Sequence, residues 1–260
     1  MRIIIITIAI LLILSNGLAL GQSFEDLVLE GKELIDEGVN LWKYNKMLTA
    51  RALFERMLET QDDNNKWLIY YYLTYCDYRL ADYFMSQDDK KQAKDFIDDG
   101  LEMLDKCIEL KPKSADAFAL RSSLLGRKAG LNPLKAIWYG PKSNNAIKNA
   151  LQLDNQNPRV YLIKGINQYF TPEMWGGGKE KALSTLKKSV ELFSKDTAEF
   201  PMPDWGYDES YMWLGIIEMD LNHLDSAEVC LQRALEKNPN CGRIKNVLLF
   251  KLEEKRKVGN

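Results

Sequence analysis

Histidine is almost absent from this sequence, and cysteine is sparse. Among 260 residues there is one histidine, His223, and there are four widely spaced cysteines, Cys76, Cys107, Cys230 and Cys241. Structural zinc sites need about four cysteine or histidine ligands at short spacings, and a general base is most often a histidine held in a pocket. Because neither arrangement occurs, we predict that the chain is not an enzyme and holds neither a metal ion nor a cofactor.

An excess of charge of either sign is also missing. The chain has 35 basic and 37 acidic residues, a formal net charge of -2, and both signs are scattered along it. A nucleic-acid-binding protein shows a basic stripe, and a protein that binds a membrane surface shows a polybasic segment. We therefore expect no nucleic-acid partner and no membrane-surface role.

A long hydrophobic run occurs only at the N-terminus. Arg2 precedes an apolar stretch from Ile3 to Leu14, which breaks at Ser15 and is followed by the small residues of Ala19-Leu20-Gly21. This pattern is typical of a signal peptide, and the run is shorter than the roughly 20 residues that span a bilayer. We predict that residues 1–21 are removed and that the protein is exported, to the periplasm or outside the cell. An uncleaved membrane anchor is the alternative.

The cysteines have two interpretations in an exported protein. Cys76 is expected in the middle of one helix and Cys107 near the far end of the next, an offset that makes a disulfide awkward because bridged α-carbons lie within about 7 Å. We expect free, buried thiols, with a disulfide as the alternative.

The C-terminal third carries a recognisable repeat. Residues 208–241 have small, aromatic and apolar residues at the spacings of the tetratricopeptide pattern, namely Tyr211, Leu214, Gly215, Ala227, Leu231, Ala234 and Pro239. The small residues Gly215 and Ala227 would let two helices approach closely, and Pro239 would end the second helix. The segment resembles one complete tetratricopeptide repeat.

Weaker copies precede it. The pattern predicts an all-α, right-handed solenoid of about five antiparallel helix pairs, one domain over residues 22–260, with pairs near 31–64, 65–112, 113–157, 158–196 and 208–241 and a capping helix in 242–260. Residues 161–183 resemble a segment of exported bacterial tetratricopeptide proteins. They also loosely resemble periplasmic tetratricopeptide subunits that accompany solute transporters.

The resemblance implies which residues face the concave side of the solenoid. By register these are largely apolar and aromatic, which is typical of partner-binding grooves, and they are Trp42, Leu68, Tyr72, Tyr75, Arg127, Leu162, Ile166, Tyr169, Phe170, Met212 and Met219. Burial of some of these side chains between repeats is the alternative.

Three irregular segments place a tryptophan near glycine: Trp138, Trp175 and Trp205. Long loops in a solenoid are often functional, and these could form a rim or lid over the groove. Alternatively, Trp138 and Trp175 could plug the edge of the solenoid. We expect Gly176-Gly177-Gly178 to permit an unusual loop conformation.

Two functions follow as hypotheses. The first is an exported scaffold that binds a segment of another envelope or secreted protein on its concave face. The second is a carrier, associated with a transporter, that holds a small apolar ligand beneath the tryptophan loops.

Overall fold

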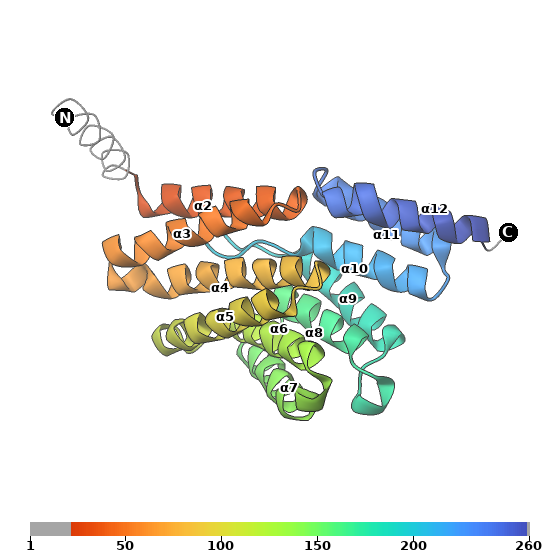
Figure 1. The fold of residues 1–260 in the computed structure, drawn as a ribbon, viewed down its shortest axis with the longest axis horizontal. Helices are drawn as coiled ribbons and strands as arrows, with labels where there is room; N and C mark the ends of the chain where they lie inside the picture. Colours follow the sequence, from red (N-terminus) through yellow and green to blue (C-terminus); the bar gives the residue numbers. More distant parts are fainter. Residues whose placement is uncertain (1–21, 259–260) are drawn as a thin grey trace.

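The computed structural model describes residues 22–258, and the predicted signal peptide lies outside the described residues. These residues form only helices, in antiparallel succession (Figure 1). Their bounds are α2 (Phe24–Asn40), α3 (Tyr44–Thr60), α4 (Asp63–Ser86), α5 (Lys90–Leu110), α6 (Ala115–Leu131), η1 (Pro133–Lys135), α7 (Ala136–Leu153), α8 (Pro158–Phe170), η2 (Glu173–Trp175), α9 (Lys179–Phe193), α10 (Tyr207–Asp220), α11 (Leu224–Lys237), η3 (Ile244–Leu248) and α12 (Leu249–Val258).

The predicted all-α solenoid is confirmed. The pairs are α2 with α3, α4 with α5, α6 with α7, α8 with α9, and α10 with α11, and α12 packs on α11. The first pair begins at Phe24, seven residues before the predicted start, because Ser23 forms a capping box with Asp26 and so begins the helix there.

Small residues let the paired helices approach, as predicted for Gly215. A β-carbon on Gly215 would lie 2.8 Å from Leu231 Cδ2, and one on Gly165 would lie 2.6 Å from Leu186 Cγ. Both distances are too short for any side chain, so glycine sets the spacing of these helix pairs.

The two ends of the solenoid meet. Asn238 Nδ2 donates a hydrogen bond to Asn40 Oδ1 at 2.9 Å, and Figure 1 shows the end of α2 beside the connection from α11 to α12. The superhelix therefore curls far enough to enclose its concave face.

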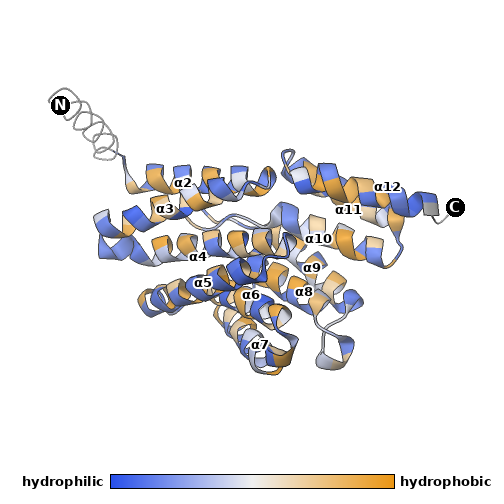
Figure 2. Ribbon diagram, in the orientation of Figure 1, coloured by the Kyte–Doolittle hydropathy of each residue, from blue (hydrophilic) through white to orange (hydrophobic). Residues whose placement is uncertain are grey.

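Hydrophobic and hydrophilic residues alternate along most helices (Figure 2), and the apolar ones form one extended core through the repeats. Within residues 22–258, no helix is long and apolar enough to span a membrane.

Candidate functional site

The concave face is covered by the chain itself. The segment between α9 and α10, residues 194–206, which we call the strap, reaches toward α2 and α4 before α10 begins (Figure 1, cyan). Tyr72 donates a hydrogen bond from its hydroxyl to the Pro201 carbonyl at 2.7 Å, and Lys32 pairs with Asp204 at 2.8 Å. The strap is thus held along the inner surface by a hydrogen bond and an ion pair.

Trp205 is the main aromatic anchor of the strap. Its ring stacks on Tyr75 with 4.8 Å between centroids, and its Nε1 donates a hydrogen bond to the Tyr71 hydroxyl at 2.9 Å. Burial raises the pKa of Tyr71 well above its ordinary value, so the phenol stays neutral and can accept this bond. Of the three predicted lid residues, Trp205 therefore lies over the concave face.

A buried ion pair lies beneath the strap and joins distant repeats. Arg79 of α4 donates to both carboxylate oxygens of Glu209 in α10, at 2.6 and 2.7 Å. Its guanidinium also lies over the rings of Tyr75, Tyr78 and Trp205, at 4.8, 4.9 and 5.5 Å from their centroids. Bidentate pairing and aromatic contact compensate for the burial of this charge.

Most of the predicted groove residues are not available to a partner. Seven have 4 % or less of their surface exposed: Leu68, Tyr72, Tyr75, Leu162, Ile166, Met212 and Met219. They pack in the core or under the strap because the solenoid is tightly curled and its inner surface is filled. These seven residues are therefore buried, as in the alternative interpretation, and they do not line an open groove.

The remaining predicted groove residues are dispersed. Trp42 lies in the α2–α3 turn and donates a hydrogen bond to Ser86. Arg127 forms a two-bond ion pair with Asp82, and the Tyr169 hydroxyl donates to Asp220. Phe170 is 68 % exposed at the end of α8.

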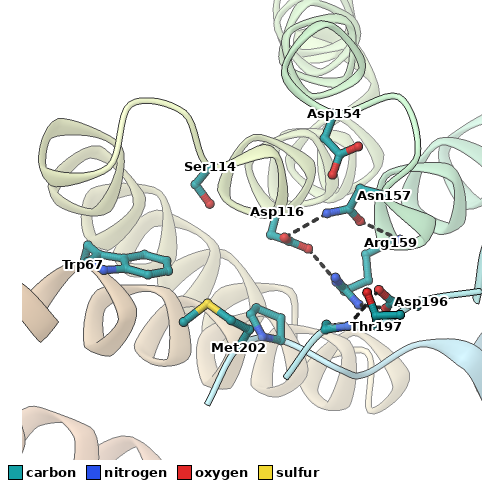
Figure 3. A pocket seen from close by; sticks show the side chains of 11 residues that line it. Trp67, Ser114, Asp116, Asp154, Asn157, Arg159, Asp196, Thr197 and Met202 are labelled. Atoms are coloured by element: carbon teal, nitrogen blue, oxygen red, sulfur yellow. Dashed lines mark hydrogen bonds and ion pairs between the residues drawn. The ribbon is translucent and has the colours of Figure 1, made fainter. Parts of the chain in front are cut away.

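A recess opens where the strap meets the N-terminal ends of α6 and α8 (Figure 3). It has a volume of about 320 Å³. Trp67 forms one side, Asp154, Asn157 and Arg159 lie opposite, and Met202 of the strap lies below them in the view. An adjoining recess of about 340 Å³ shares Arg159 and extends toward Lys195.

Arg159 organises this recess. Its Nε donates to Asp116 at 2.6 Å and its Nη1 to Asp196 of the strap at 2.8 Å. Burial lowers the pKa of the guanidinium, but Asp116, Tyr71 and Asp196 together outweigh that effect, so its pKa lies above the ordinary value and it stays charged. Asn157 caps α8 and donates to the same Asp116.

A second candidate surface is an exposed apolar edge. We define the edge by six side chains that follow the ends of α6 and α8, each 68 to 90 % exposed: Leu134, Ile137, Trp138, Phe170, Met174 and Trp175. The two helices run in register, because a β-carbon on Gly126 would lie 2.9 Å from Asn167 Oδ1. Both groups therefore leave the solenoid on the same side, the lower one in Figure 1.

The predicted roles of Trp138 and Trp175 are corrected by this exposure. Each ring is 70 % exposed, so neither covers the concave face as a lid and neither plugs the solenoid. Both tryptophans face solvent.

The glycine run at 176–178 has the conformational role that was predicted. Gly176 and Gly178 have φ values of 85° and 106°, a region that favours glycine. All three amides donate hydrogen bonds to carbonyls of the preceding loop and helix. None of them is left to bind an anion.

The remaining reactive residues form no catalytic arrangement in the described part of the chain. His223 lies in the α10–α11 turn and contacts Glu218, with 2.8 Å between Nδ1 and Oε2. The four cysteines are free thiols, as expected. No group of three potential metal ligands occurs among residues 22–258.

Sequence reasoning singled out Trp205, Trp138 and Trp175, but it missed the pairing of Lys32 with the strap and the edge residues Leu134, Ile137 and Met174. A tryptophan after Pro-Met-Pro-Asp could have suggested an anchored extended segment. A charge bias marks the sequence around the first half of the edge, because residues 117–153 contain six basic residues and no acidic one.

Comparison with known proteins places the fold. A family model described as a tetratricopeptide repeat matches residues 208–241. Among solved structures, the HusA haemophore from Porphyromonas gingivalis is 25% identical, with a TM-score of 0.58, over 73% of this chain and 93% of that one. TTC0263, a tetratricopeptide protein of Thermus thermophilus, is 19% identical, with a TM-score of 0.53, over 86% of this chain and 98% of that one. The comparison with curated proteins gave no match.

The tetratricopeptide architecture is that of proteins that bind other proteins or peptides, and it suggests an interaction scaffold here. One repeat is matched by its sequence, and most of the chain is matched by the arrangement of its helix pairs. Residues 208–241 match the tetratricopeptide-repeat family, and the helix pairs of the chain are arranged as in tetratricopeptide-repeat proteins.

Proposed function

We propose that this chain is an exported, non-catalytic carrier that binds a flat apolar ligand of the porphyrin class on the edge. The observation that carries the proposal is the exposure of six large apolar side chains, including Trp138 and Trp175, at the end of α8, in the first turn of α7 and on the α6–α7 and α8–α9 connections. Monomeric proteins rarely expose such a group of side chains unless it binds something. Two indole rings suit the face of a conjugated macrocycle, because aromatic rings stack in offset arrangements.

The charges around the edge suit a ligand that also carries carboxylates. Lys135 is exposed beside Leu134, and Lys181 lies near Gly176, next to Trp175. Neither lysine has an acidic partner in residues 22–258. A porphyrin with an apolar face and acidic side groups would place its face on the tryptophans and its carboxylates on these lysines.

The likeness to a haemophore supports the same ligand class, since it covers 93% of that chain. The edge contains no histidine or cysteine, and among its six side chains only the thioether of Met174 is of a type that binds haem iron. Binding would therefore depend on the face of the macrocycle more than on its metal, and iron-free protoporphyrin should bind about as well as haem. Export is supported by the signal-peptide pattern of residues 1–21.

Titration of the mature chain with haem and with protoporphyrin, followed by tryptophan quenching and by ligand absorbance, tests the proposal. Substitution of both Trp138 and Trp175 by alanine should weaken binding at least about tenfold, because each stacked ring contributes on the order of 1 kcal/mol. The matched control is Phe250→Ala, which removes an aromatic ring that is 59 % exposed on the C-terminal helix.

Equal affinity of the double variant and the wild type would exclude the edge as the porphyrin site. Failure of both ligands to bind the wild type would exclude the carrier function.

A partner-binding scaffold is the second candidate, and a specific observation favours it. The strap shows that the concave face can hold an extended segment through Tyr72, Tyr75 and Lys32. A partner segment of similar chemistry could occupy that face if the strap were displaced.

This candidate can be tested with the strap itself. In a variant whose residues 196–205 are replaced by a glycine-serine linker, a synthetic peptide of those residues should bind in trans, as measured by fluorescence anisotropy. The same peptide with its tryptophan changed to alanine is the control. An absence of binding, in a variant whose circular dichroism is unchanged, would leave the strap as a purely structural element.

A further inference from the structure

We propose that the recess at Arg159 is a second binding site, which takes the zwitterionic head of an α-amino acid with an apolar side chain. It lies at the N-terminal ends of α6 and α8, whereas the edge follows their C-terminal ends. The inference is therefore independent of the proposed function.

One nitrogen of the Arg159 guanidinium, Nη2, could donate a hydrogen bond to a ligand. The residue has 4 % of its surface exposed and uses Nε and Nη1 in ion pairs. Its Nη2 has no acceptor within hydrogen-bond distance in residues 22–258 and is not enclosed by protein. The side chain is fixed by Asp116 and Asp196, so this nitrogen is presented to the recess in one orientation. A carboxylate would complete its hydrogen bonding.

Two helix N-termini and two hydroxyl groups lie beside that nitrogen and could donate hydrogen bonds to a carboxylate. Ser114 caps α6 and Asn157 caps α8, so the positive ends of two helices meet beside Arg159. The hydroxyl of Ser114 can donate a further bond, because within residues 22–258 it only accepts one, from the Ala117 amide. Thr197 of the strap supplies a second hydroxyl.

Asp154 provides a position for the ammonium group of the ligand. Asp116 and Asp196 are engaged by Arg159, but within residues 22–258 Asp154 accepts only one bond, from the Gln156 amide at 2.9 Å. Its side chain is exposed and lines the recess. One free carboxylate and one free guanidinium nitrogen in the same recess are complementary to the two charges of an amino acid.

One side of the recess is apolar. Trp67 and Met202 lie on the side away from Asp154 and Arg159 (Figure 3), and Pro203 also lines the recess. The recess is at the small end of the range for ligand pockets, about 300 to 1,000 Å³. An aliphatic or aromatic side chain of one residue fits this description. The adjoining recess would accommodate the second residue of a dipeptide.

The test is a titration of isotope-labelled mature protein with L-leucine, L-methionine and L-tryptophan, followed by amide chemical shifts and calorimetry. Shifts should be centred on Ser114, Thr197 and the Trp67 indole. Leucinamide, which lacks the carboxylate, and 4-methylpentanoate, which lacks the ammonium, should each bind at least about tenfold more weakly, as expected for loss of a charged hydrogen bond. Leu-Leu distinguishes a free amino acid from a peptide as the source of the head group.

Asp154→Asn should lower the affinity for leucine by about tenfold or more, with little change in stability because the side chain is exposed. The matched control is Asp88→Asn, in the α4–α5 turn, where the side chain is 86% exposed, and it should bind as the wild type does. The proposal is overturned if no amino acid shifts these resonances at millimolar concentration, or if Asp154→Asn retains the wild-type affinity.

Discussion

The concave face and the edge have similar side chains but opposite surroundings. Tyr72 and Tyr75 on the concave face are 1 % and 4 % exposed, whereas Trp138 and Trp175 on the edge are each 70 % exposed. The difference arises because the concave face is covered by the strap, while no described segment covers the edge.

This contrast separates residues that hold the fold from residues that are free to bind. Removing a covered group should cost stability, because it leaves a cavity or an unpaired charge. Removing an exposed group should cost binding and little stability. Four predictions test that separation, from the largest expected effect to the smallest.

The largest effect is expected at the ion pair under the strap. Glu209→Ala leaves the Arg79 guanidinium buried without its bidentate partner, since that side chain is only 7% exposed. We expect a loss of about 3 to 5 kcal/mol in the free energy of unfolding, measured by urea denaturation. The double variant Arg79→Met with Glu209→Met should recover much of the loss. A single variant as stable as the wild type would show that this face is not held by the pair.

The second prediction compares tryptophans directly. Trp205→Ala removes a ring stacked on Tyr75 together with its hydrogen bond to Tyr71, and should cost about 2 to 4 kcal/mol. Trp138→Ala and Trp175→Ala should each stay within about 0.5 kcal/mol of the wild type. Thermal denaturation of the three variants checks this order, and similar losses in all three would contradict the contrast between the two surfaces.

The third prediction concerns two glycines. Gly206 ends the strap with φ of 107°, and a β-carbon there would lie 2.7 Å from Leu162 Cδ2. Gly206→Ala should therefore destabilise the protein by about 1 to 3 kcal/mol. Gly130, near the end of α6, has nothing within 4 Å of its β-carbon position, and Gly130→Ala should be neutral or stabilising by about 0.5 kcal/mol. The melting temperature should fall clearly for Gly206→Ala and should not fall for Gly130→Ala.

The smallest effect is in thiol reactivity. Burial raises the pKa of Cys107 to about 12 and that of the half-buried Cys230 to about 11. The reactive thiolate is therefore scarce at neutral pH for both, and Cys230 should be alkylated first because a reagent can reach it. Peptide mass spectrometry after timed alkylation at pH 8 measures the order. Faster labelling of Cys107 would indicate that α5 opens locally.

Much of the fold could be predicted from local patterns. Small residues within the segment 208–241, including Gly215 and Ala227, predicted a closely packed helix pair. In the structure they allow the two helices of that pair to approach closely. The predicted bounds failed at the first pair, because Ser23 and Asp26 form a cap that precedes the apolar register.

The candidate sites were less predictable. Register placed Tyr72 and Tyr169 on one concave surface, but it contains no information on how tightly the solenoid curls. Tyr72 binds the strap and Tyr169 pairs with Asp220. The recess at Arg159 joins residues from α4, α6, α8 and the strap, and no spacing in the sequence links them.

The sequence by itself determined that the protein is helical, repetitive and poor in catalytic residues, because helix periodicity, small residues and composition are local properties of the chain. Only the tertiary structure decided which aromatic residues are covered and which are exposed. That outcome depends on the curl of the superhelix and on the path of residues 194–206, which result from contacts such as those of Arg79 with Glu209 and of Trp205 with Tyr75. These contacts join residues about 130 positions apart, beyond the reach of any local pattern.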